Sequence, residues 1–124
     1  TFPYIRPQET GHKTDIRWMS LSNGKVGILA TSENLIEGSV HQYPYSDLDY
    51  IPNSQKHGLL DIQPKDQVDW LIDYKQMGVG GDNSWGARPH DQYTLPAQYY
   101  EFNFQLIPFK AGENLFEIYE QGYN

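Results

Sequence analysis

The stretch DIRWMSLSNGKVGILATS, residues 15–32, predicts a β-hairpin and with it the fold class. Two apolar-rich runs flank Asn23-Gly24, and Asn-Gly between such runs strongly favours a two-residue type I′ turn. In the resulting register Ser22 faces Lys25. One face of the hairpin then carries Met19, Leu21, Val26, Ile28 and Ala30, and the other carries Ile16, Trp18 and Leu29. Both faces are apolar, so we expect the hairpin to need cover on two sides.

Two later segments alternate in the way that half-buried strands do. Residues 67–76 place Asp69 and Asp73 on the solvent face, and residues 99–107 place Glu101, Asn103 and Gln105 there. The inward residues are Val68, Trp70, Ile72 and Tyr74 in the first segment and Tyr100, Phe102, Phe104 and Leu106 in the second. Together with the hairpin, these segments predict an all-β, antiparallel fold.

The remaining segments are expected to be shorter or irregular. Residues 39–45 read as a short strand, and residues 46–51 as one helical turn that Ser46 caps and that ends before Pro52. The apolar group at residues 115–119 is interpreted as a late strand or a loosely docked extension. We therefore divide the chain into a β-sandwich segment, residues 1–109, and a C-terminal extension, residues 110–124.

Composition limits the classes of partner and site. A chain of 124 residues fits one domain, and its formal net charge of −7 argues against binding nucleic acid or anionic membranes. The apolar runs are far shorter than a bilayer requires. Cysteine is absent, which excludes disulfides and thiol chemistry and fits either a reducing or an oxidising compartment, so the compartment stays open. Ten Tyr, five Phe and three Trp residues suit β-sheets and surfaces that contact carbohydrate.

The segment between the two alternating strands, residues 77–91, predicts a long shaped loop. Its glycines do not form a nucleotide-binding motif, since no Lys-Ser or Lys-Thr follows them and no helix pattern comes after. They are better explained by positive φ angles and close backbone approach, which let the loop turn tightly and present Trp85. A tryptophan on such a loop is a flat platform on which the C–H face of a sugar can stack, whereas Trp18 and Trp70 lie inside predicted strands.

Other chemistry-bearing residues favour structural roles. The four histidines, at positions 12, 41, 57 and 90, have no paired metal-ligand spacing, so we assign no metal and no cofactor. A catalytic carboxylate pair needs one desolvated member, whereas Asp69 and Asp73 are expected to face solvent. No Gly-x-Ser-x-Gly motif is present. No residue of this chain is therefore assigned a catalytic role.

The order of three motifs resembles the last part of the large bacterial β-galactosidases of glycoside hydrolase family 2. These are YIRPQETG at residues 4–11, Arg17-Trp18, and MGVGGDNSW at residues 77–85, of which the last is the most specific. The resemblance extends from Tyr4 to about Pro108. It implies an antiparallel super-sandwich of the galactose mutarotase-like kind, of which this chain would be the C-terminal half.

The resemblance also implies roles for individual residues. In that family two glutamates on a separate (β/α)8 barrel carry out retaining hydrolysis, and no residue here matches either one. Trp85 matches the tryptophan that forms a platform for the sugar at the mouth of the active site, while Gly78, Gly80, Gly81 and Asp82 match residues that shape its loop. The expected partners are a β-galactoside substrate and the other domains of the parent enzyme.

Two functions remain open at this point. The first is an accessory domain of a β-galactosidase that acts on terminal β-D-galactosides such as lactose. The alternative is a free-standing carbohydrate-binding or lectin-like module with Trp85 in its own site. A module usually gathers several exposed aromatic residues in one groove, whereas an accessory domain needs one or two at an edge. Because a hairpin that is apolar on both faces and half a sandwich leave surfaces uncovered, we also expect the isolated chain to self-associate.

Overall fold

The computed structural model describes residues 11–48, 62–78, 80–83 and 85–122, and they form an antiparallel β-sheet with one short helix. The all-β prediction is therefore confirmed. In chain order the elements are β1 (Lys13–Ser22), β2 (Val26–His41), the 3-10 turn η1 (Tyr45–Leu48), β3 (Asp69–Asp73), the 3-10 turn η2 (Asp91–Tyr93), β4 (Gln105–Lys110) and α1 (Leu115–Gln121).

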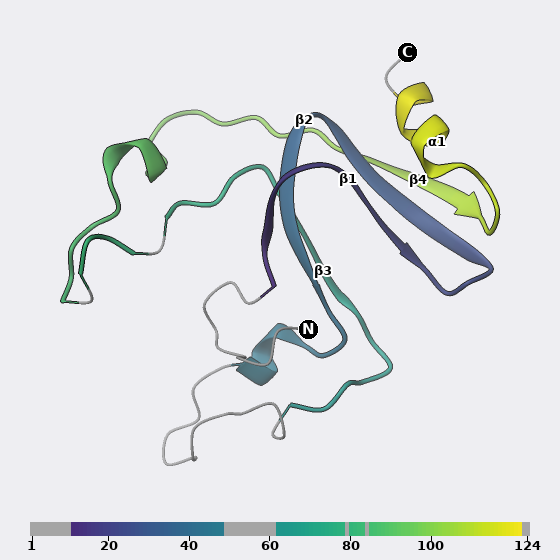
Figure 1. The fold of residues 1–124 in the computed structure, drawn as a ribbon, viewed down its shortest axis with the longest axis horizontal. Coiled ribbons are helices and arrows are strands. Elements are labelled where there is room, and N and C mark those ends of the chain that lie inside the picture. Colours follow the sequence, from purple (N-terminus) through teal and green to yellow (C-terminus); the bar gives the residue numbers. More distant parts are fainter. Residues whose placement is uncertain (1–10, 49–61, 79, 84, 123–124) are drawn as a thin grey trace.

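Every strand pair in the described residues includes β2. On one edge β2 pairs with β1 from Lys13 to Ser22. On its other edge the first half of β2 pairs with β4 and the second half with β3. Strands β3 and β4 thus lie one after the other along the same edge, as Figure 1 shows, and the segment that connects them leaves the sheet and returns.

The hairpin between β1 and β2 is present, but its turn lies one residue later than predicted. Ser22 pairs with Gly27, and the backbone N–H of Asn23 donates to the carbonyl of Val26, so Gly24 and Lys25 are the central turn residues. Gly24 has φ 86° and Lys25 has no positive φ, which is the pattern of a type II′ turn rather than type I′. The Asn23 side chain instead accepts hydrogen bonds from the N–H groups of Lys25 and Val26. Because the register shifts by two residues, the predicted faces are kept.

Two bulges bend the β1–β2 pair. Asp15, with φ 56°, is an extra residue on β1 between the pairs Lys13–Gly38 and Ile16–Ile36. Between Ile16–Ile36 and Trp18–Thr31 the extra residues are on β2, in the stretch 32–35. The Ser32 hydroxyl there donates to the carbonyl of Asn103, which fixes the segment before β4 against the bend.

The hydrophobic core is small and follows β2. Its buried apolar residues are Leu29, Ala30, Ile36, Tyr43, Ile62 and Phe109. Phe109 packs over Gly27, where a Cβ would lie 2.2 Å from its ring. Helix α1 lies beside β4, with Gly122 next to the side chain of Ile107 (Figure 1). Val26, Ile28 and Leu106, by contrast, stay exposed, and all three lie on the same face of the sheet.

Several predicted element boundaries were wrong. Residues 39–41 belong to the long strand β2 and not to a separate strand, and the second alternating segment becomes a strand only at Gln105. Phe102 and Phe104 lie before it and stack on each other, with ring centroids 5.4 Å apart. The helical turn expected at 46–51 is η1; residues 49–51 lie outside the described residues.

The tail contains a helix, so its interpretation as a late strand was wrong. Leu115, Phe116, Ile118 and Tyr119 have the spacing of one helical face. Asn114 caps the helix by accepting a hydrogen bond from the N–H of Phe116, and its amide donates to Glu117. The local capping sequence therefore outweighs the strand propensity of the aromatic residues.

Candidate functional site

The candidate site is the loop that follows β3. Figure 1 shows the segment between β3 and β4 extending away from the sheet, on the side opposite α1. Its two sides run back along each other, because the N–H of Gly78 donates to the carbonyl of Tyr93 over 2.7 Å. We refer to residues 77–93 as the Trp85 loop, and to the region where Gly81 meets Ala87 and Arg88 as its neck.

Two glycines allow the sides of this loop to approach each other closely. A Cβ on Gly81 would lie 2.5 Å from the carbonyl oxygen of Arg88 and 2.6 Å from that of Ala87. A Cβ on Gly78 would lie 3.1 Å from the Cβ of Tyr93. The close backbone approach expected of the loop glycines is thus found at Gly78 and Gly81.

The positive φ angles that were expected of these glycines are found at another residue of the loop. Gly78 and Gly81 have no positive φ, and among the described residues of the loop the left-handed angle belongs to Gly86, with φ 108°. At Gly80 an added Cβ would meet no atom of the described residues within 4 Å. The structure therefore gives Gly81 a steric reason to be glycine and gives Gly80 none.

Polar side chains hold the loop on both sides of Trp85. Asp82 contacts His90 across the neck, with 2.7 Å between the carboxylate and Nε2. The side chain of Asn83 accepts hydrogen bonds from the N–H groups of Trp85 and Ala87, at 2.9 and 3.4 Å. Asn83 is therefore the residue that shapes the tip, although sequence reasoning did not single it out.

Trp85 lies at the tip of this loop and is 92% exposed. It is the most exposed of the large hydrophobic side chains in the described part of the chain. Trp18 and Trp70 lie in strands, β1 and β3, as predicted, and both are half-buried. Trp85 thus differs from the other two tryptophans in its burial as well as in its position.

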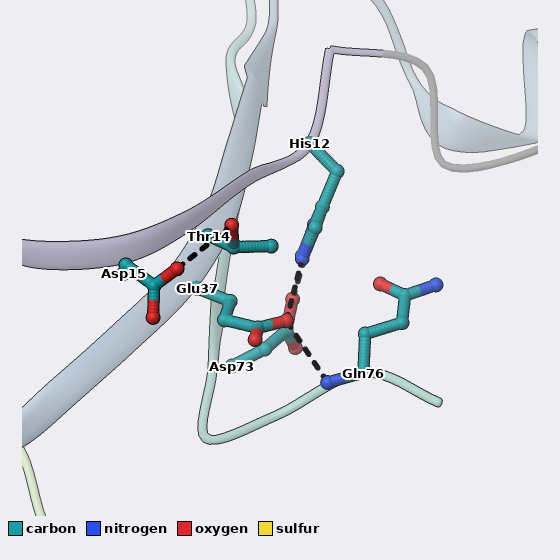
Figure 2. Close-up of polar contacts among 6 residues, drawn as sticks. All are labelled: His12, Thr14, Asp15, Glu37, Asp73 and Gln76. Atoms are coloured by element: carbon teal, nitrogen blue, oxygen red, sulfur yellow. Dashed lines mark hydrogen bonds and ion pairs between the residues drawn. The ribbon is translucent and has the colours of Figure 1, made fainter. Parts of the chain in front are cut away.

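A second polar cluster lies at the base of the loop, where β2 faces β3. Glu37 and Asp73 are opposite each other in the strand register. His12, just before β1, approaches both: its Nε2 is 3.1 Å from the Glu37 carboxylate and its Nδ1 is 3.9 Å from that of Asp73 (Figure 2). The same Glu37 oxygen accepts the backbone N–H of Gln76 over 2.9 Å.

Asp69 and Asp73 do not face solvent freely, so that prediction was wrong. Asp73 is half-buried beside His12, and Asp69 accepts the backbone N–H of Tyr45 at the start of η1. All five residues of β3 are half-buried, so the structure does not show the predicted alternation of a buried and a solvent face. The face that was assigned to water lies beside the buried residues Ser39 and His41 of β2. Asp69 thus contacts the first residue of η1, and Asp73 lies beside the residue that precedes β1.

The histidines likewise make local contacts. His12 and His90 each contact a carboxylate, and His41 is buried with its ring centroid 5.1 Å from that of Tyr43. His57 lies outside the described residues. Among the residues that are described, no group of three or more His, Cys, Asp or Glu side chains could hold a metal ion, and no helix is long and apolar enough to cross a membrane.

Comparison with known proteins identifies the family. The family model described as beta galactosidase small chain matches residues 1–106. The chain belongs to the beta galactosidase small chain family. That match includes β1, β2, β3 and the Trp85 loop and ends at the second residue of β4, whereas α1 lies beyond it.

Curated relatives of this small chain region carry the name beta-galactosidase. One from Priestia megaterium is 39% identical over 108 residues, which is 86% of this chain and 10% of that protein. Relatives from Staphylococcus xylosus and Lactobacillus delbrueckii subsp. bulgaricus are 31% and 35% identical over 83% and 77% of this chain. The chain spans about a tenth of the length of the curated relatives it matches.

Proposed function

We propose that this chain is the C-terminal accessory domain of a retaining β-galactosidase that hydrolyses terminal β-D-galactosides such as lactose. In this proposal the catalytic carboxylates belong to a (β/α)8 barrel outside the chain. The chain contributes Trp85 as an aromatic platform at the mouth of the active site, together with contacts to the other domains. Membership of the beta galactosidase small chain family and the names of the relatives support the assignment to this enzyme.

The single observation that supports the platform is the exposure of Trp85 at the tip of a braced loop. Hydrogen bonds on Asn83 and the tight neck at Gly81 limit the positions that the tip can occupy. A rigid, exposed indole loses little conformational entropy when a sugar stacks on it. These are the properties that a substrate platform needs.

The same exposure favours the accessory domain over a free-standing carbohydrate-binding module. Binding sites for small molecules are concave and bury most of the ligand surface. An indole that is 92% exposed supplies one wall of such a site and leaves the others to a partner. Trp18, which could have extended a binding groove, is half-buried in β1, whereas Tyr93 in the Trp85 loop is 60% exposed and counts toward a module.

Replacement of Trp85 in the intact enzyme tests the proposal. Stacking covers up to about a third of an indole whose full burial removes about 250 Å² from water, which is worth about 1 to 2 kcal/mol. Trp85→Ala should therefore raise KM for lactose by roughly 5- to 30-fold, while kcat changes little because ground and transition states lose the same contact. Trp85→Phe keeps a smaller aromatic platform, so its KM for lactose should lie between those of the parent enzyme and Trp85→Ala.

Two substrates separate a platform from a domain contact. The loss should be larger for lactose than for methyl β-galactoside, whose leaving group is too small to reach the indole. Equal losses on both substrates, together with a lower melting temperature, would mean that Trp85 only packs against a neighbouring domain. That result would remove the platform from the proposal.

A further inference from the structure

We propose that Glu37 is a positioning residue for the Trp85 loop: it fixes the base of the loop by binding the backbone N–H of Gln76, and His12 holds its carboxylate in place. This inference rests on the proposed function, because it concerns how the platform is held. It assigns no contact with substrate to Glu37 or His12.

Glu37 connects three segments that are distant in the sequence. It lies on β2, and one of its oxygens accepts both the N–H of Gln76, at 2.9 Å, and Nε2 of His12, at 3.1 Å, when that nitrogen carries the proton. Figure 2 shows the carboxylate directed toward both partners. One oxygen atom of Glu37, in the second half of β2, thus joins the segment before β1 to the residues after β3.

Burial makes this contact strong. The side chains of His12 and Glu37 are 8% and 16% exposed. A carboxylate so far removed from water is stable only where donors replace its hydration, and hydrogen bonds to a charged acceptor are about twice as strong as neutral ones. The position of Glu37 is therefore well determined.

The strand register explains why a histidine lies at this place. Glu37 and Asp73 are direct partners across the β2–β3 ladder, and like charges at such a position repel each other. His12 lies between them, 3.1 Å from one carboxylate and 3.9 Å from the other. The ring keeps the Glu37 carboxylate from turning away from Asp73, and so keeps it directed at Gln76.

Gln76 lies between the end of β3 and the start of the Trp85 loop. Strand β3 ends at Asp73, and the Trp85 loop begins at Met77. The next backbone hydrogen bond toward the tip, from Gly78 to Tyr93, joins the two sides of the loop to each other and not to the sheet. The contact between Glu37 and Gln76 therefore sets the direction in which the loop leaves the sheet, and with it the location of Trp85.

A double-mutant cycle in the intact enzyme tests this role. Glu37→Ala should raise KM for lactose, with kcat nearly unchanged, by a factor no larger than the roughly 5- to 30-fold expected for Trp85→Ala. In the Trp85→Ala background Glu37→Ala should cause no further rise, because it acts through Trp85. Glu37→Gln, whose amide oxygen can still accept the Gln76 N–H, should restore most of the affinity. Hydrogen exchange at the Gln76 amide should become faster in Glu37→Ala and stay slow in Glu37→Gln.

The outcomes distinguish this inference from the proposed function. If Trp85→Ala raises KM and Glu37→Ala does not, or if the two effects simply add, the positioning role is wrong and the platform stands. If Trp85→Ala leaves KM unchanged, the platform is wrong, and hydrogen exchange then decides: faster exchange at Gln76 and through the loop in Glu37→Ala supports positioning, and unchanged exchange refutes it. If Glu37→Ala does not fold, Glu37→Asp replaces it, since its carboxylate is withdrawn by one methylene and should give the same pattern.

Discussion

Gly81→Ala tests whether the neck of the loop holds Trp85 in place, and Gly80→Ala is its matched control. At Gly81 the new Cβ would lie 2.5 Å from the carbonyl oxygen of Arg88, whereas ordinary contact begins near 3.4 Å. The two sides of the neck would have to separate by about 0.9 Å, because both contacts are with backbone that cannot rotate away. At Gly80 the same methyl group enters space that no described residue occupies.

Gly81→Ala should weaken the binding of lactose to the platform and leave the stability of the sheet unchanged. A shift of almost an ångström at the neck displaces the indole and removes part of its stacking energy, so KM for lactose should rise by about three- to tenfold. This rise in KM should not exceed the rise caused by Trp85→Ala, which removes the indole altogether. Gly80→Ala should stay within about twofold of the parent enzyme, and neither change should lower the melting temperature, because the loop lies outside the core.

Steady-state kinetics on lactose, with and without Trp85→Ala in the same enzyme, provide the assay. If the neck acts through the indole, Gly81→Ala adds nothing once Trp85 is absent. Equal KM values for the Gly81→Ala and Gly80→Ala enzymes would refute the reasoning. A fall in kcat of the same size as the rise in KM would also refute it, because the loop would then affect chemistry directly.

Two further predictions concern Tyr43, which follows β2, and the exposed face of the sheet. Burial raises the pKa of Tyr43, whose hydroxyl has no hydrogen-bond partner among the described residues. The free energy of unfolding should therefore be unaffected below about pH 10 and fall as the pH rises beyond it, because the unfolded chain loses the phenolic proton first. Tyr43→Phe should remove this alkaline loss in denaturation curves measured from pH 8 to 11. The isolated chain should self-associate through the exposed face of Val26, Ile28 and Leu106, and Ile28→Lys should shift light scattering toward the monomer. A Ser22→Lys control should leave the association unchanged, and a monomeric parent chain at high concentration would contradict the prediction.

The parts of the fold that could be predicted from sequence are those set by local patterns. The hairpin at residues 15–32 has a turn sequence and two apolar faces, and the faces survived the shift of the turn because a register change of two residues preserves alternation. Residues 99–104 alternate as well, yet they form no strand. The pairing of β4 with β2 begins only at Gln105, opposite Thr31, so the residues before Gln105 have no strand to pair with in the described part of the chain. Alternation indicates that a segment can form a strand, whereas pairing depends on a partner far away in the sequence.

In the candidate site, too, local features could be predicted from sequence and long-range contacts could not. Trp85 stood out because its glycine-rich surroundings are local, and its exposure agrees with a surface role. The contact of His12 with Glu37 and Asp73 joins residues that no motif connects, and it depends on the strand register and on the bulge at Asp15. Sequence reasoning without pairing information could not have found it.

The pairing of both β3 and β4 with β2 has a consequence for how this domain can change in evolution. The two ends of residues 74–104 are attached to one edge of the same strand, and β3 and β4 do not pair with each other. Insertions or deletions between them therefore alter no strand register, and the entropic cost of a longer loop grows only slowly with its length. New loops can be tried at this position while the sheet stays intact, so the segment can diverge in length and sequence among relatives that keep a common sheet.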